Sequence, residues 1–254
     1  MARLTLLGVE VDPFTIQELN ATIAVAGARG ERWIIAHHNL HSVYLYHRDS
    51  RMRNLYAQAR VIYIDGMPIL LFARLLGYPL RREHRITCVD WIHPLMQEAA
   101  RKGWRVFYLG GKPGVAECAA GTLRKQYPET QIATHYGYFR PEENERILDT
   151  IAAYRPHVLM VGMGMPRQEH WIPENLEQIH ANVIIAVGAC FDYIAEAIPT
   201  PPRWMGRMGL EWLYRLWSEP TRLAWRYLIE PWFLVPFMPR DILNRCLALR
   251  SGHK

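Results

Sequence analysis

Residues 158–171, VLMVGMGMPRQEHW, begin as an apolar run, pass through two glycines one residue apart, and then become polar. A short apolar run that ends at glycine and continues into a polar, helix-like segment is typical of a buried strand leading into a helix. A dinucleotide-binding turn needs a third glycine, as in G-x-G-x-x-G, but Arg167 stands at that place. The stretch therefore predicts one strand–helix unit of an α/β protein and argues against an oxidoreductase.

The same alternation continues on both sides of this stretch. Apolar, strand-like runs occur at 3–11, 33–37, 61–65, 104–110, 131–139, 158–164 and 183–188. Helix-like segments lie between them at 15–28, 41–59, 67–77, 88–102, 114–127, 141–154 and 167–180. Strands that alternate with helices in this way form a parallel sheet with helices on both faces. We expect an α/β fold with a doubly wound, mostly parallel, Rossmann-like sheet.

The end of the chain differs in composition from the rest. The segment IPTPP at 198–202 separates a predicted α/β domain, residues 1–199, from a basic helical appendage, residues 200–254. The appendage has nine Arg and Lys residues against four acidic ones, and it holds five of the nine tryptophans. This pattern suits an anionic membrane surface, where indole rings lie among headgroups, or a nucleic acid, where they stack on bases. Packing of helices with one solvated face would give the same pattern.

The whole-chain composition fits a folded cytoplasmic protein. With 254 residues, 50% of them hydrophobic and 21% charged, the chain is long enough to bury a sizeable core. The four cysteines are scattered without a C-x-x-C pair, which indicates neither a zinc site nor a disulfide scaffold and favours a reducing compartment. We find no signal-peptide pattern and no run of 18 apolar residues, so we expect no membrane-spanning segment.

Polar residues follow several of the predicted strands, and ligands of open parallel sheets bind beyond the carboxyl ends of strands. In HHNLH at 37–41, His37 and Asn39 are predicted to contact a ligand rather than a metal, because adjacent strand side chains point to opposite faces. Asp65 follows the next apolar run, which places it at the carboxyl end of a predicted central strand, and it is either the N-cap of a helix or a general base. Asp90 and Asp192, each near a helix start, are the alternative bases.

The turn GGKPG at 110–114 opens a predicted helix, where free backbone N–H groups and the helix dipole favour a phosphate. Gly110, Gly111 and Lys112 are therefore candidate phosphate-binding residues, although a tight strand-to-helix turn would also need glycine. The Walker A pattern G-x-x-x-x-G-K-[ST] is absent, which argues against ordinary P-loop phosphoryl transfer.

A set of motifs in one fixed order resembles the WecG/TagA/CpsF glycosyltransferases. The set comprises DGMP at 65–68, R-x-T-x-x-D at 85–90, LGGKPG at 109–114, VGMGMPRQE at 161–169, G-x-x-F-D at 188–192, LEWLYRL at 210–216 and E-P-x-R-L at 219–223. The resemblance extends from about residue 5 to residue 240. Each motif alone is weak, but the ordered set is specific.

The resemblance implies inverting transfer of a sugar from a UDP-sugar to a glycan on a polyprenyl diphosphate, during assembly of a bacterial surface polysaccharide. It assigns the general base to Asp65 and implies no metal or other cofactor, in agreement with the absence of a D-x-D pair from the chain. Arginines would then neutralise the departing diphosphate, and Arg215, Arg222 and Arg226 share one face if their helix is continuous across Pro220. The expected substrate-binding residues are His37, Asn39, Asp90, Gly110, Gly111, Lys112, Gly164, Gln168, Glu169, Asp192 and Arg226.

Two positions help to choose a branch of this family. Teichoic-acid-type members carry a small hydroxyl residue where this chain has His37 and a basic residue where it has Thr200. The motif HHNLH resembles instead the exopolysaccharide branch of the xanthan and acetan kind, which implies UDP-glucose as donor and a glucosyl-diphosphate-lipid acceptor. UDP-N-acetylmannosamine or its uronic acid is the alternative donor.

The expected partners follow from this resemblance. They are the UDP-sugar, the polyprenyl-linked acceptor and the anionic inner face of the cell membrane, with a homo-oligomer left open and no nucleic acid. A non-catalytic nucleotide- or nucleic-acid-binding module is the alternative from another class, but RNP, helix-turn-helix and zinc-finger signatures are absent.

Overall fold

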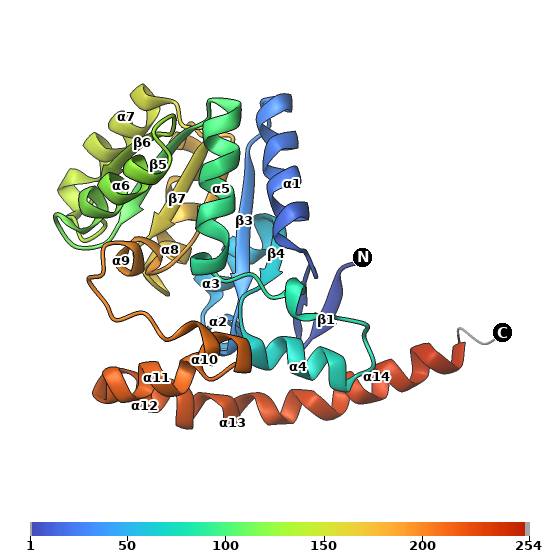
Figure 1. The fold of residues 1–254 in the computed structure, drawn as a ribbon. Coiled ribbons are helices and arrows are strands. Elements are labelled where there is room, and N and C mark those ends of the chain that lie inside the picture. Colours follow the sequence, from blue (N-terminus) through green and yellow to red (C-terminus); the bar gives the residue numbers. More distant parts are fainter. Residues whose placement is uncertain (1, 252–254) are drawn as a thin grey trace.

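A computed structural model describes residues 2–251 as a layered α/β body with a helical appendage (Figure 1). Six parallel strands form the central sheet in the order β4-β3-β8-β7-β5-β6. Their bounds are β3 Trp33–His38, β4 Ala59–Ile64, β5 Arg105–Gly110, β6 Gln131–His135, β7 Val158–Gly162 and β8 Val183–Ala186. The predicted α/β class with a parallel sheet is confirmed.

Helices cover both faces of this sheet. One face packs against α1 Ile16–Arg29, α5 Cys88–Lys102, α6 Val115–Gln126 and α9 Cys190–Ile194. The other packs against α2 Leu40–Arg48, α3 Ser50–Gln58, α7 Asn144–Tyr154 and α8 Arg167–Asn175. Strand side chains alternate between the faces, so Ile35 joins the first core while Ile34 and Ala36 join the second. The strands are apolar on both sides for this reason.

Three of the predicted elements were wrong in detail. Residues 3–11 form an antiparallel hairpin, β1 Leu4–Leu6 and β2 Val9–Val11, and not one strand, because Leu7 and Gly8 turn the chain with positive φ. The helix expected at 41–59 is divided at Asp49, which has extended φ and ψ and caps α3 with its side chain. The run 131–139 leaves the sheet after His135.

The appendage consists of short helices that lie along the side of the body to which the carboxyl ends of the strands point (Figure 1). They are α10 Arg203–Met208, α11 Glu211–Ser218, α12 Pro220–Leu228, α13 Glu230–Leu234, η4 Val235–Phe237 and α14 Met238–Ser251. Leu234 is buried with α4 (Met67–Leu75) and the hairpin in a third apolar core.

Two buried acids also attach the appendage to the body. Glu230 accepts a hydrogen bond from the His41 ring at 2.6 Å, and Asp241 accepts one from the Leu7 amide at 2.5 Å. Lys254, counted with the basic residues, lies outside the described part of the chain. No helix within residues 2–251 is long and apolar enough to cross a membrane.

Cys88 and Cys190 form a disulfide between the first residues of α5 and α9, with their Cα atoms 5.6 Å apart. The spacing of the cysteines gave no sign of this pair, because 102 residues separate its members. The inference that the scattered cysteines indicate no disulfide and favour a reducing compartment therefore missed this pair. Cys118 and Cys246 are free and exposed.

Candidate active site

The site is built where β3 and β4 end side by side. His37 lies opposite Tyr63 and His38 opposite Ile64, so the next residues of both strands leave the sheet together. The backbone amides of Asp65 and Gly66 both donate to the His38 carbonyl, at 3.0 and 3.2 Å. A Cβ on Gly66 would lie 2.9 Å from the Cα of Asn39, so only glycine permits this approach. The DG pair thus holds Asp65 against the end of β3.

Asp65 follows an edge strand and not a central one, which corrects the sequence interpretation. The edge is covered because Asp12, just after the hairpin, bridges to Tyr63 and exchanges hydrogen bonds with Ile62. Asp65 does not cap a helix either: the N-cap of α4 is Gly66, without a side-chain cap. The Asp65 carboxylate is therefore available for other partners, and 29% of its side chain is exposed.

Asn39 orients this carboxylate. Its Nδ2 donates to Asp65 Oδ2 at 3.2 Å, while its Oδ1 accepts from the Ser42 amide at 3.1 Å as the N-cap of α2. Because the Ser42 amide can only donate, the cap fixes which end of the Asn39 amide faces Asp65. One oxygen of Asp65 is thus held in place by Asn39, whose contact with a ligand stays a prediction.

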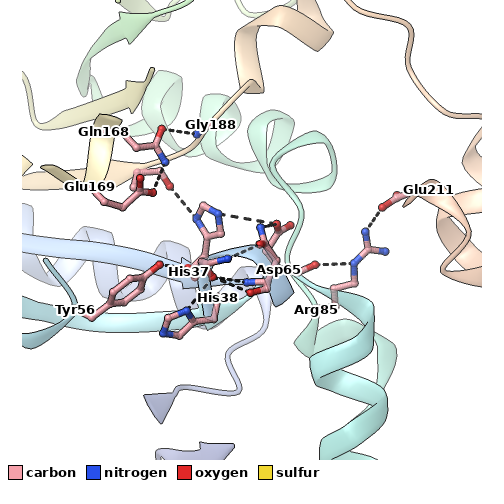
Figure 2. Close-up of polar contacts among 12 residues, drawn as sticks. His37, His38, Tyr56, Asp65, Arg85, Gln168, Glu169, Gly188 and Glu211 are labelled. Carbon is pink, nitrogen blue, oxygen red and sulfur yellow. Dashed lines mark hydrogen bonds and ion pairs between the residues drawn. The ribbon is translucent and has the colours of Figure 1, made fainter. Parts of the chain in front are cut away.

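His37 and His38 point in different directions, as expected for adjacent strand residues (Figure 2). The Nδ1 of His37 lies 3.0 Å from the Ala186 carbonyl, and its Nε2 lies 4.0 Å from Asp65 Oδ2. Burial lowers the pKa of His37, partly offset by the Asp65 charge. His38 stacks on Tyr56 and bonds Ser42, on the far side of the strand. The motif HHNLH therefore sends one histidine to the site.

Gln168 and Glu169 lie next to this group (Figure 2). The Gln168 side chain is fully buried, and its Oε1 accepts from the backbone amides of Gly164 and Gly188 at 3.2 and 3.1 Å. Its Nε2 donates to Glu169 Oε1 at 2.7 Å. Gln168 therefore ties the turn after β7 to the turn after β8, and it is not a surface residue at a helix start.

Glu169 is a buried acid with an incomplete set of partners. It is 1% exposed, and its Oε2 has no hydrogen-bond partner in the described chain. Burial raises the pKa of Glu169 to about 7, against the opposing effects of the Gln168 hydrogen bond and of Arg226. A carboxyl group in this state can exchange a proton near neutral pH.

The glycine turn after β5 has a steric explanation. A Cβ on Gly110 would lie 2.4 Å from the Gly162 carbonyl oxygen of the neighbouring strand, and Gly111 has positive φ. Lys112 is exposed, and its charge lowers the pKa of Asp192, whereas burial raises that pKa more strongly. The turn thus places a cation opposite a half-buried acid.

Asp90 lies in the first turn of α5 and is exposed. Its carboxylate accepts a hydrogen bond from Thr87 Oγ1 at 2.9 Å and lies 4.0 Å from Arg82. Sequence reasoning missed Arg85, a buried residue whose Nε donates to the Asp65 carbonyl at 2.9 Å and whose guanidinium pairs with Glu211 of α11. The only feature of the sequence that pointed to Arg85 was its place in the motif R-x-T-x-x-D at 85–90.

The three arginines of the appendage do not share one continuous helix, because α11 ends and α12 begins around Glu219. Arg222 bonds Glu219 at 2.5 and 2.8 Å on the surface. Arg226 is half-buried and faces the body: its charge lowers the pKa of His37 and of Glu169, and Asp65 in turn raises that of Arg226. Arg215 interacts electrostatically with Arg226 and with Tyr193.

The geometry thus gathers His37, Asn39, Asp65, Gln168 and Glu169 from three segments of the body, with Arg226 of the appendage facing them. The family model of the glycosyl transferase WecG/TagA/CpsF family matches residues 4–246, which include both the body and most of the appendage. Membership implies a nucleotide-sugar donor and a sugar acceptor. The chain belongs to the WecG/TagA/CpsF family of glycosyl transferases.

Proposed function

We propose that the protein is an inverting, metal-independent transferase of bacterial surface polysaccharide synthesis. It moves a hexose, which we propose to be glucose, from a UDP-sugar to a polyprenyl-diphosphate-linked sugar. The observation that carries the proposal is the Asp65 carboxylate at the carboxyl edge of the sheet, held by Asn39, partly exposed and faced by Arg226. Inversion needs one base to remove the proton of the attacking hydroxyl, and a positioned carboxylate supplies it.

The diphosphate of the donor needs positive charge as it leaves. Arg226 and Arg215 lie on the appendage side of the site, and Arg222 lies on the same helix as Arg226. Guanidinium groups form forked contacts with phosphate oxygens, and their charge stabilises the departing group without a metal ion. Lys112 and the glycine turn at 110–111 are the proposed contacts on the body side, together with Asp192, and Asp90 is proposed at the rim.

The proposed acceptor is anchored in a bilayer, so we propose that the appendage lies on the anionic inner face of the membrane as a peripheral contact. Its exposed large apolar side chains support this, and they continue onto α4: Trp204, Trp212, Trp217, Trp225, Trp232, Leu71 and Leu75. Indole rings are suited to the headgroup region, and each nearby Arg or Lys adds about 1 kcal/mol of attraction to anionic lipid.

The proposal is tested by incubating the purified chain with radiolabelled UDP-sugars and a polyprenyl-diphosphate-glucose acceptor. We expect transfer from UDP-glucose, and transfer from UDP-N-acetylmannosamine or its uronic acid alone would replace the donor while keeping the reaction. Inactivity with every UDP-sugar, for a chain that melts cooperatively, would overturn the function.

The base is tested by Asp65→Asn, which keeps the shape of the side chain and removes the proton acceptor. We expect turnover to fall about 10²-fold or more, with UDP affinity nearly unchanged in calorimetry. Asp149→Asn is the matched control, because Asp149 is an exposed acid on α7 that has no place in the proposed site. Near-normal turnover of Asp65→Asn would transfer the role of base to another residue.

A further inference from the structure

The tautomer of His37 is determined by its surroundings. The Nδ1 atom lies 3.0 Å from the Ala186 carbonyl oxygen, which can only accept, so Nδ1 carries the hydrogen. Burial lowers the pKa of His37, and the ring is neutral at physiological pH. The Nε2 atom therefore presents a bare lone pair toward Asp65.

Two hydrogen-bond acceptors consequently face one another. The Nε2 of His37 and the Oδ2 of Asp65 are 4.0 Å apart, which is too far for a direct hydrogen bond. Each is fixed from behind, His37 by Ala186 and Asp65 by Asn39. Facing acceptors repel unless a proton lies between them, and one proton delivered by a ligand converts the repulsion into an ion pair.

We propose that His37 is a second catalytic residue, which takes over from Asp65 the proton of the attacking hydroxyl. This inference rests on the proposed transfer from a UDP-sugar. The bond from the acceptor oxygen to the anomeric carbon forms while the bond from that carbon to the diphosphate oxygen breaks, and UDP leaves with the electron pair. The hydroxyl proton passes to Oδ2 of Asp65, which then becomes a donor attracted to the bare Nε2 of His37, 4.0 Å away. The two atoms close to hydrogen-bond distance, the proton moves to Nε2, and it returns to solvent after the product leaves.

The chemistry of the two groups favours this direction. An imidazole, whose ordinary pKa is near 6.5, holds a proton more firmly than a carboxylate, whose ordinary value is near 3.9. Burial lowers the pKa of His37 and narrows this difference, whereas the regenerated carboxylate of Asp65 acts in the opposite direction and favours the imidazolium beside it. Asp65 is then free of the proton, so the reverse reaction lacks its acid.

The groups around His37 affect its protonation and leave its Nε2 atom available for the proton. Burial lowers the pKa of His37 before the reaction, and the charge of Arg226 on α12 adds a smaller effect in the same direction. The Tyr63 ring of β4 lies 5.4 Å from the imidazole, and the Tyr56 hydroxyl donates to the His37 carbonyl, so neither competes for Nε2. Glu169 lies on the same side of the sheet end in Figure 2 and bonds Gln168 instead.

Chemical rescue tests the inference in the full-length chain. His37→Ala removes the ring and leaves a space for a free imidazole, so we expect turnover to fall about 10²-fold and to recover at least tenfold with added imidazole. Methylated and halogenated imidazoles of similar size differ in basicity, and the recovered rate is expected to rise with basicity. A purely structural ring would give a recovery that follows size and not basicity.

His38→Ala is the matched control, because His38 is an equally buried neighbour whose Nε2 has no partner in the described chain but which lies away from Asp65. We expect no gain from imidazole in this variant. His37→Gln, which accepts a hydrogen bond but no proton, is expected to bind UDP normally in calorimetry and to lose turnover without loss of melting temperature.

The outcomes separate this inference from the proposed function. Wild-type turnover in His37→Gln, or recovery of His37→Ala that ignores basicity, would overturn the role of His37 while leaving Asp65 and the transfer intact. Absence of transfer by the wild-type chain with every UDP-sugar would refute the function itself.

Discussion

Replacing Glu169 by glutamine tests the electrostatics of the site without reference to a substrate. The side chain is 1% exposed, and burial raises its pKa from the ordinary 4.5 to about 7. A tenfold change in ionisation corresponds to about 1.4 kcal/mol, so keeping this carboxylate ionised in the folded state costs about 3 kcal/mol. Glutamine has nearly the same shape and carries no such cost.

The sign of the pH dependence follows from the raised pKa. Between pH 4.5 and about pH 7 the folded protein keeps the proton on Glu169, whereas the unfolded chain has lost it. Stability from this residue is therefore fully present below 4.5, falls as the pH rises, and is lost above about 7. We expect Glu169→Gln to lie within about 1 kcal/mol of the wild type near pH 5 and to gain up to about 3 kcal/mol relative to it near pH 8.

Urea unfolding at pH 5, 6, 7 and 8 measures this difference directly. Glu174→Gln is the control, because Glu174 lies on the same helix, is exposed and pairs with Arg51. That variant is expected to stay within about 1 kcal/mol of the wild type at every pH. If the free energies of unfolding of Glu169→Gln and the wild type differed by the same amount at every pH, the carboxyl group would not be held neutral by burial, and the reasoning would fail.

Three further outcomes are expected. Transfer activity survives EDTA, and its abolition by EDTA with recovery by Mn²⁺ would contradict diphosphate neutralisation by arginines. Truncation after Pro199 removes sedimentation with anionic liposomes and nearly all transfer, and unchanged binding and transfer would refute the membrane role of the appendage. Arg226→Ala lowers turnover about 10²-fold. Arg222→Ala, which removes a surface ion pair with Glu219, lowers turnover less and leaves liposome binding intact. A larger loss of turnover in Arg222→Ala than in Arg226→Ala would transfer the diphosphate contact to Arg222.

The sequence by itself determined the fold class, and it placed the candidate site at the carboxyl ends of the strands. Apolar runs such as 158–162 and 183–186 and the periodic segments between them are local patterns, and each strand or helix depends mainly on its own side chains. The position of Asp65 directly after an apolar run was likewise readable, whereas the need for Gly66 beside it became clear only from the structure. These features required no knowledge of which strands are neighbours.

Only the tertiary structure decided which residues meet. Asp65 follows an edge strand, Arg226 faces the site while Arg222 stays on the surface, and Cys88 pairs with Cys190 across 102 residues. The tautomer of His37 depends on a carbonyl of β8, 149 residues away. Such relations arise from the packing of distant segments, and the periods of 2 and 3.6 residues that reveal strands and helices carry no information about that packing.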